Sequence, residues 1–157
     1  MRNIAISVIC VVGFISAANA ETPSPALYGR LTSNQTRIVF AYAGDLWSVD
    51  RAGGTAKRLT TNPAEESFPV FSPDGSRLAF SRQVGGNWDV YVMPADGGEE
   101  KRVTFHPQSD YAMTWTPDGK SIVFWSNRGP VGQLYRIEPG AQLETEIPLP
   151  KAFNASL

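Results

Sequence analysis

The segment from Trp88 to Phe124 reads WDVYVMPADGGEEKRVTFHPQSDYAMTWTPDGKSIVF, and the segment before it follows the same pattern. The matching positions are all 44 residues apart, and they hold aromatic, glycine, arginine and turn-forming residues. A third copy opens at the same step with Leu134-Tyr135. Self-similarity at a fixed period of this length indicates a repeat architecture. The matching segments are Asp45-Leu46-Trp47 with Asp89-Val90-Tyr91, Gly53-Gly54 with Gly97-Gly98, Arg58-Leu59-Thr60 with Arg102-Val103-Thr104, Phe71-Ser72-Pro73-Asp74-Gly75 with Trp115-Thr116-Pro117-Asp118-Gly119, and Phe80 with Phe124.

Each repeat holds four short candidate strands joined by Gly-Gly and Pro-Asp-Gly turn signals. Four strands in about 44 residues is the content of one propeller blade. The sequence therefore predicts an all-β fold, a β-propeller of about three four-stranded blades in an incomplete ring. The expected repeat units are roughly 26–81, 82–125 and 126–157, the last one incomplete. The expected strands are 27–32, 37–42, 46–49, 57–60, 68–72, 78–80, 88–92, 102–105, 111–115, 122–125, 134–137 and 144–147.

Two of these strands carry more specific predictions. Residues 37–42 place apolar side chains on both faces, so the pattern predicts a strand that is buried on both sides. Residues 57–60 form a short polar strand, and its Lys57 and Arg58 suit a sheet edge, where charge discourages pairing with a stray strand.

The first twenty residues have the pattern of a secretory signal peptide rather than of the fold. Arg2 supplies a positive start, residues 4–18 are largely apolar, and Ala18-Asn19-Ala20 matches the small-residue cleavage pattern. The apolar run is shorter than the roughly 20 residues that a membrane span needs, although an uncleaved anchor stays open. We expect cleavage after Ala20, export to the periplasm or secretion, and no membrane span in the mature chain, residues 21–157.

The composition excludes several classes of function. The chain has 42% apolar and 18% charged residues and a formal net charge of −1, so it shows no electrostatic footprint for nucleic acid. Cys10, the single cysteine, lies within the expected signal peptide. We therefore expect no disulfide, no thiolate nucleophile and no cysteine metal ligand in the mature protein.

The third repeat breaks off shortly before another Ser-Pro-Asp-Gly turn would be due. Closed propellers use four to eight blades, so an arc of three would expose strand edges and an apolar flank. We expect the chain to be the N-terminal piece of a longer protein; closure by homo-oligomerisation is the alternative.

Candidate catalytic and metal-binding residues have simpler interpretations. His106 with Ser109 and Asp110 is interpreted as a connecting loop, because closeness in sequence is not the geometry of a triad. Asp74 and Asp118 are interpreted as turn formers, and Glu65-Glu66 and Glu99-Glu100 as solvated loop charge rather than a calcium site. We therefore predict no catalytic, cofactor-binding or metal-binding residues in this chain.

The aromatic residues divide into two groups. Trp47 and Trp115 have aromatic equivalents one repeat away, which favours a role in blade packing, whereas Trp88 and Trp125 have none and leave a surface role open. Asn34-Gln35-Thr36 and Asn154-Ala155-Ser156 match the glycosylation acceptor pattern, which is short enough to arise by chance.

At Gly44-Asp45-Leu46-Trp47, Arg102-Val103-Thr104-Phe105-His106-Pro107 and Trp115-Thr116-Pro117-Asp118-Gly119-Lys120 the chain resembles the N-terminal β-propeller of tricorn-type serine peptidases. The resemblance runs from about Tyr28 to the end, and TolB-like and prolyl-oligopeptidase-type propellers share its turn elements. It implies a non-catalytic propeller that admits or guides peptide substrates toward a catalytic region further along the chain. The best-known members of the family are intracellular, so the expected export signal departs from the family pattern.

Three functional hypotheses follow. The first is the propeller portion of an exported tricorn-like serine peptidase, with peptide or protein substrates as its partners. The second is a TolB-like periplasmic propeller that docks other proteins, although such a protein should carry a small mixed domain ahead of its blades, for which there is no room here. The third is a propeller attached to another hydrolase. The sequence beyond Leu157 would discriminate between them.

Overall fold

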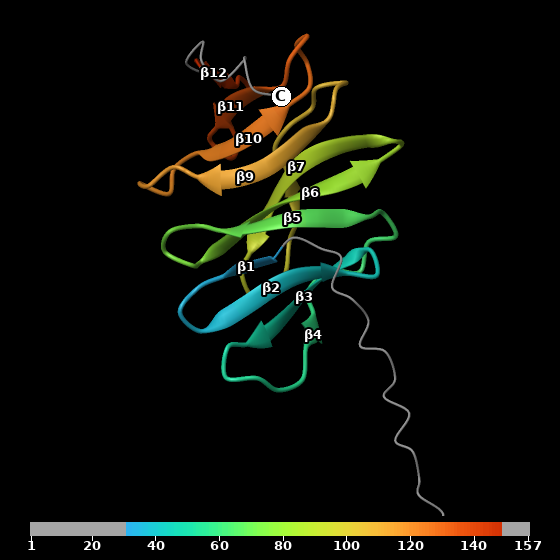
Figure 1. Cartoon of the computed structure of the whole chain (residues 1–157), viewed down its shortest axis with the longest axis vertical. Coiled ribbons are helices and arrows are strands. Elements are labelled where there is room, and N and C mark those ends of the chain that lie inside the picture. The colour runs from blue at the N-terminus through green and yellow to red at the C-terminus, as the bar shows by residue number, and fades with distance from the viewer. Residues whose placement is uncertain (1–30, 149–157) are drawn as a thin grey trace, which may run out of the picture.

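The computed structural model describes residues 31–148 as twelve β-strands in three four-stranded antiparallel sheets (Figure 1). The expected signal peptide lies outside these described residues. The strand order within each sheet follows the chain, as expected for successive propeller blades. The strands are β1 (Leu31–Ser33), β2 (Arg37–Tyr42), β3 (Asp45–Asp50), β4 (Lys57–Arg58), β5 (Glu66–Phe71), β6 (Arg77–Val84), β7 (Asn87–Pro94), β8 (Lys101–Arg102), β9 (Asp110–Trp115), β10 (Ile122–Ser126), β11 (Gln133–Ile137) and β12 (Thr145–Ile147).

The prediction of an all-β propeller with about three four-stranded blades is confirmed. The three sheets follow one another along the long axis of Figure 1, and β5 contacts both β1 and β9. The sheets and the expected repeat units begin at different residues, because each Ser/Thr-Pro-Asp-Gly turn joins the first two strands of a sheet. The first two expected units therefore each include strands of two sheets, whereas the third holds only strands of the third sheet.

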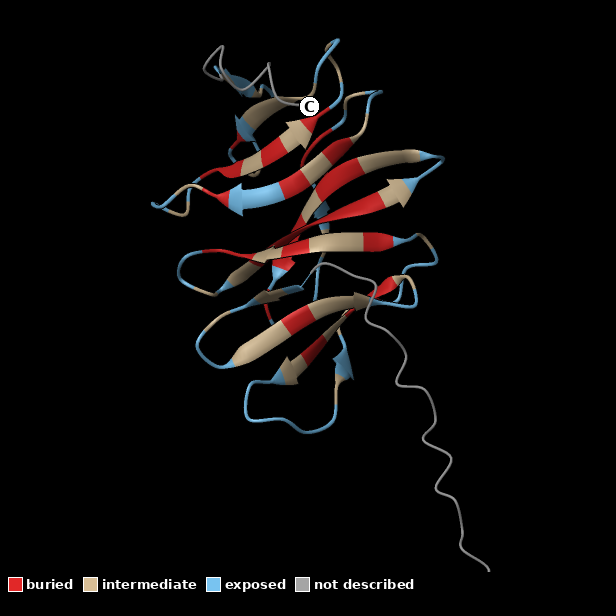
Figure 2. Ribbon diagram, in the orientation of Figure 1, coloured by how far each residue is buried: buried red, intermediate tan, exposed pale blue. Residues whose placement is uncertain are grey.

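The core lies between the sheets (Figure 2). Between the first and second sheets, Val39 and Leu46 pack with Phe71, Leu78 and other buried residues of the second sheet. Between the second and third sheets, a larger cluster joins residues of both. Its members are Ala79, Val90, Val92 and Val103 from one side, and Ala112, Trp115, Ile122, Phe124 and Ile137 from the other.

The prediction that residues 37–42 are buried on both faces is wrong. Val39 is fully buried, but Ile38 and Phe40 are half-buried and Tyr42 is 40% exposed. The reason is positional: Val39 faces the second sheet, whereas no sheet within residues 31–148 covers the opposite face of β2.

An arginine near the start of the second strand links each of the first two sheets to the next sheet. Arg37 donates from Nη1 to the Ala95 carbonyl at 3.1 Å and to the Asp96 carboxylate at 2.6 Å, both in the second sheet's loop. Arg77 repeats the contact one sheet further, with its Nη2 2.6 Å from the Gly119 carbonyl and its guanidinium 4.4 Å from the Trp115 ring centroid. Adjacent sheets are therefore fixed by polar contacts as well as by apolar burial.

Candidate functional site

The repeated Asp-Leu/Val-aromatic and Arg-Leu/Val-Thr motifs form ion pairs between the third and fourth strands, each joining a buried carboxylate to an exposed arginine. The Asp45 carboxylate lies 2.7 Å from the Arg58 guanidinium, and Asp89 lies 2.8 Å from Arg102. The two edge arginines are therefore partners of buried carboxylates, a role that the sequence analysis did not assign to them. One oxygen, Oδ1, of each aspartate has no hydrogen-bond partner in the described chain.

A second, larger network joins the first strand of a sheet to the loop between its third and fourth strands. In the second sheet, Arg82 is 5% exposed and bonds to both Glu66 and Glu100. Its guanidinium carbon also lies 4.6 Å from the Tyr91 ring centroid. The interpretation of the Glu65-Glu66 and Glu99-Glu100 pairs as solvated loop charge is therefore wrong for one glutamate in each pair. Glu66 is the first residue of β5 and is 1% exposed, so it is a buried strand residue and not solvated loop charge.

The third sheet builds the same network with different spacing. Arg128 donates from Nη2 to both carboxylate oxygens of Asp110, at 3.0 and 3.1 Å, and lies 3.4 Å from Glu144. Asp110 and Glu144 stand 44 residues after Glu66 and Glu100, but the arginine has moved from the Ser126 position to residue 128. The shared pattern of two acids around one arginine indicates a structural role in each sheet.

Burial sets the protonation behaviour of these networks. Burial raises the pKa of Glu66, although hydrogen bonds from Thr60 and Arg82 oppose the rise. Burial likewise raises the pKa of Asp89, against the opposing hydrogen bond from Arg102.

His106, Ser109 and Asp110 are bonded to different partners. His106 Nδ1 accepts from the Gln108 backbone N–H at 3.1 Å, and the Ser109 hydroxyl donates to the Asn87 side chain at 3.2 Å. Asp110 is paired with Arg128, as described above. These bonds hold the connection between the second and third sheets, which agrees with the interpretation of His106 as a loop residue.

Asp74 and Asp118 close equivalent turns. The Asp74 carboxylate accepts from the Ser76 backbone N–H at 3.1 Å, and Asp118 accepts from the Lys120 N–H at the same distance. Hydrogen bonds from the Ser72 hydroxyl and then from Ser76 lower the pKa of Asp74 to about 2. The interpretation of both residues as turn formers is confirmed.

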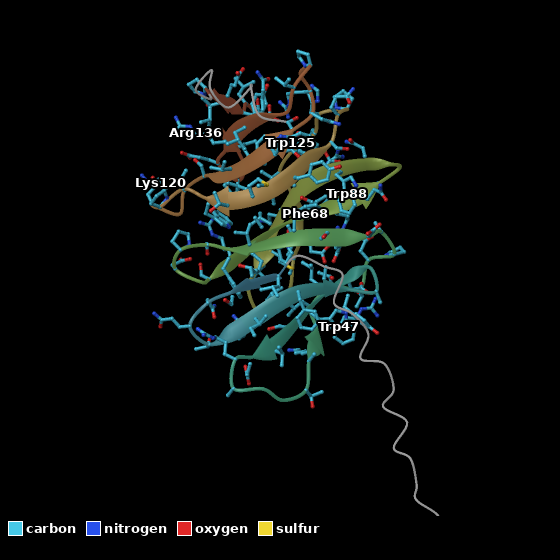
Figure 3. The ribbon with its side chains drawn as sticks, in the orientation of Figure 1. Trp47, Phe68, Trp88, Lys120, Trp125 and Arg136 are labelled. Atoms are coloured by element: carbon cyan, nitrogen blue, oxygen red, sulfur yellow. The ribbon has the colours of Figure 1, made fainter. Side chains whose placement is uncertain are left out.

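An aromatic patch lies where β5 and β9 begin, on the second and third sheets. We define the aromatic patch as Phe68, Trp88, Tyr111, Met113 and Trp125. The Tyr111 ring is central, with its centroid 5.1 Å from that of Phe68 and 5.7 Å from that of Trp125. Figure 3 shows Phe68, Trp88 and Trp125 on these two sheets and Trp47 apart, on the first sheet. The rings therefore form one cluster across two sheets.

All members of the aromatic patch except Trp88 line an open depression of about 510 Å³, and one of them, Met113, is 45% exposed. Phe68 has a φ of 56°, in the left-handed region that a phenylalanine rarely adopts, and it lies in a β-bulge between Ser67 and Val70. Bulges and strained residues of this kind are concentrated next to functional sites, where they re-aim a side chain. An exposed group of aromatic and methionine side chains offers apolar, adaptable contacts to a ligand.

Two members of this patch, Trp88 and Trp125, can be identified from the sequence because they lack aromatic equivalents in the other repeats. Phe68, Tyr111 and Met113 were not predicted as members. The sequence carries one further signal, which concerns the position of Trp125. Gly132 stands 44 residues after Trp88, so the third repeat has no side chain where the second repeat has a large ring. A Cβ atom on Gly132 would meet the Trp125 ring at 1.9 Å, so the glycine makes room for that ring.

The other tryptophans pack as structural residues. Trp115 is 5% exposed and donates from Nε1 to the Val70 carbonyl of the second sheet at 3.2 Å, which confirms packing between blades. Trp47 is half-buried and donates to the Tyr42 carbonyl of its own sheet at 3.1 Å. Asn34, of the first glycosylation pattern, accepts the Thr36 and Arg37 backbone N–H groups in a turn. The second pattern, at Asn154, lies outside the described residues.

Neither a metal site nor a membrane-spanning helix is found in the described part of the chain. Within residues 31–148, no three His, Cys, Asp or Glu residues are grouped so that they could hold a metal ion. The same residues contain no helix long and apolar enough to cross a membrane.

Solved structures support the propeller architecture. The chain is 28% identical to TolB from Acinetobacter baumannii, with a TM-score of 0.61, covering 73% of this chain and 30% of that one. It is 27% identical to a putative TolB from Agrobacterium tumefaciens, with a TM-score of 0.63, covering 73% and 42%. The tricorn protease shares the fold at 24% identity and a TM-score of 0.63, covering 71% of this chain and 12% of that one. The chain thus spans less than half the length of each of these proteins.

The family pattern described as "Tricorn protease N-terminal beta propeller domain" matches residues 25–157, which include every strand of the three sheets. The chain therefore belongs to the family of tricorn protease N-terminal β-propeller domains.

Proposed function

We propose that this chain is the non-catalytic propeller portion of an exported tricorn-like serine peptidase, and that it contacts peptide substrates before a catalytic region beyond this chain hydrolyses them. Membership of the tricorn propeller family supports the peptidase context. The signal-peptide pattern of residues 1–20 supports export, with the periplasm as the proposed location.

The observation that carries this proposal is the aromatic patch. Tyr111 and Met113 lie on β9, the first strand of its sheet, and Phe68 lies on β5, the corresponding strand of the preceding sheet. First strands contact one another from sheet to sheet, so the patch lies along the line on which the sheets meet. Apolar side chains of an unfolded peptide fit the chemistry of this depression, because aromatic rings and methionine bind them without requiring one sequence.

The test is a titration of the full chain with a short fluorescein-labelled peptide of alternating phenylalanine and serine, followed by fluorescence anisotropy. Met113→Asp places a charge at a position that is 45% exposed, so we expect binding at least about tenfold weaker without loss of the fold. Tyr42→Ala is the matched control, because Tyr42 is a 40% exposed aromatic residue outside the patch. Equal binding by wild type and Met113→Asp would contradict the proposal.

The alternative function is a TolB-like periplasmic propeller that acts as a protein-docking module. The 27–28% identity to two TolB structures favours it, because it exceeds the 24% identity to the tricorn protease. Sequencing the coding DNA in frame beyond codon 157 separates the two functions. A serine-peptidase region would support the first, and a frame that ends once the blades are complete would support the second.

A further inference from the structure

A groove on the outer side of the second and third sheets carries the further inference. Two depressions, of about 590 and 470 Å³, share Arg102, Val103 and Gly140 and therefore adjoin one another. We define the outer groove by these three residues with Lys101 and Ala141. It is separate from the aromatic patch, with which it shares no lining residue.

The floor of the outer groove is apolar, and one wall is an edge strand. Val92, Val103 and Ile137 line it, and each is less than 10% exposed. The wall is β8, which is hydrogen-bonded to β7 on one side only and ends its sheet. An edge strand presents backbone N–H and C=O groups that can pair with an added extended segment. The cationic side chains of β8 discourage pairing with an arbitrary strand, but they favour a segment that places acidic side chains opposite them. The shape and the backbone therefore suit an extended peptide better than a compact small molecule.

The charge at the rim selects the kind of peptide. Arg77, Lys101 and Arg102 line the smaller depression together with one acid, Glu99. Because Arg102 is already paired with the buried Asp89, the charges that remain at the rim are those of Arg77, Lys101 and Glu99. Lys101 is 66% exposed along its side chain, and its contact with Glu99, at 3.7 Å, is between two exposed groups. The Arg77 guanidinium bonds to a neutral acceptor, the Gly119 carbonyl. The rim thus holds one net positive charge, in a chain whose formal net charge is −1.

An exposed aromatic residue extends the apolar surface at the other end of the outer groove. Phe105 is 67% exposed, and the Arg102 guanidinium carbon lies 4.7 Å from its ring centroid. In the larger depression the acid Glu144 faces Arg128, which partly neutralises it. Apolar side chains on one face of a strand can therefore meet the floor while acidic side chains meet Lys101 and Arg77.

We infer that the outer groove binds an extended acidic and apolar peptide segment of a partner protein, lying beside β8 between the second and third sheets. This is a binding site in addition to the aromatic patch, and it does not depend on the peptidase function.

The test is anisotropy of the full chain with a short fluorescein-labelled peptide of alternating leucine and aspartate, compared with a peptide in which lysine replaces aspartate. We expect the aspartate peptide to bind and the lysine peptide to bind at least about tenfold more weakly. Lys101→Glu should weaken binding of the aspartate peptide by a similar factor, and Ala141→Trp, which fills the groove without changing charge, should do the same. Both positions are exposed, and a thermal melt of each variant checks that the fold is kept.

The matched control is Lys57→Glu, because Lys57 is the exposed residue at the equivalent edge position of the first sheet. We expect it to leave binding unchanged. An equal loss in Lys57→Glu and Lys101→Glu would show general electrostatic attraction and would overturn the inference. Equal binding of the two peptides, no binding of either, or full binding by a folded Ala141→Trp would overturn it as well.

Discussion

Replacement of Arg82 by methionine is the perturbation that tests the buried network most severely. The Arg82 side chain is 6% exposed and holds Glu66, whose side chain is 0% exposed, together with Glu100. Methionine keeps most of the aliphatic length but leaves Glu66 as a buried acid whose remaining bond comes from Thr60. Removing one partner of a buried ion pair typically lowers the free energy of unfolding by about 3–5 kcal/mol.

Urea denaturation of the full chain measures this loss. With a denaturant slope of about 2 kcal/mol per molar, the midpoint should fall by about 2 M. The loss should shrink as the pH is lowered, because protonation removes the buried charge. The sign follows from the pKa of Glu66, which burial raises in the folded state. The folded chain then binds the proton more tightly than the unfolded chain, so falling pH favours folding through this group.

Two further measurements isolate the cause. Arg82→Met combined with Glu66→Gln should recover part of the lost stability, because the uncompensated charge is gone. Lys101→Met, which breaks an exposed 3.7 Å pair with Glu99, should change stability by no more than about 0.5 kcal/mol. An Arg82→Met midpoint within error of wild type, or a loss that grows as the pH falls, would refute the reasoning.

Two other predictions concern the aromatic patch and the turns. Gly132→Ala would place a Cβ atom 1.9 Å from the Trp125 ring, so the ring must move. We expect the free energy of unfolding to fall by about 1–3 kcal/mol and the tryptophan emission to shift. An unchanged thermal melt and emission spectrum would contradict this packing. Asp74 has its pKa lowered to about 2, so its contribution to stability is present above its ordinary pKa of 3.8 and disappears as the pH falls toward 2. An NMR titration of the Asp74 carboxyl carbon should report this value, and Ser72→Ala should return it toward 3.8; an unshifted pKa in wild type would contradict the turn geometry.

The local signals of the sequence predicted the strands well, because Gly-Gly and Pro-Asp-Gly segments mark the turns between them. The expected strand 37–42 matches β2 at both ends, and the strands around Phe80 and Phe124 are confirmed. Burial of individual residues was less predictable. The pattern of β2 could not reveal that only one of its faces meets another sheet, since this depends on its place in the arc.

The candidate site was only partly predictable, for a related reason. Trp88 and Trp125 could be noticed as departures from the repeat, but Phe68 joins them through a bulge that changes the register of β5. Arg82 and Glu100 are separated by the β6–β7 hairpin and the loop that precedes β8, so their pairing depends on how these strands are aligned in the folded sheet. Charge in a loop-like stretch therefore appeared to be solvated, although it closes a buried network.

The most direct test of the proposed peptide contact is photo-crosslinking. A peptide of alternating phenylalanine and serine, with one phenylalanine replaced by benzoylphenylalanine, would be irradiated with the full chain, and the crosslinked residues would be found by mass spectrometry. We expect crosslinks to Met113 and its neighbours on β9, which decrease in Met113→Asp and persist in Tyr42→Ala. Crosslinks distributed over the surface, or confined to sheets away from the aromatic patch, would contradict it.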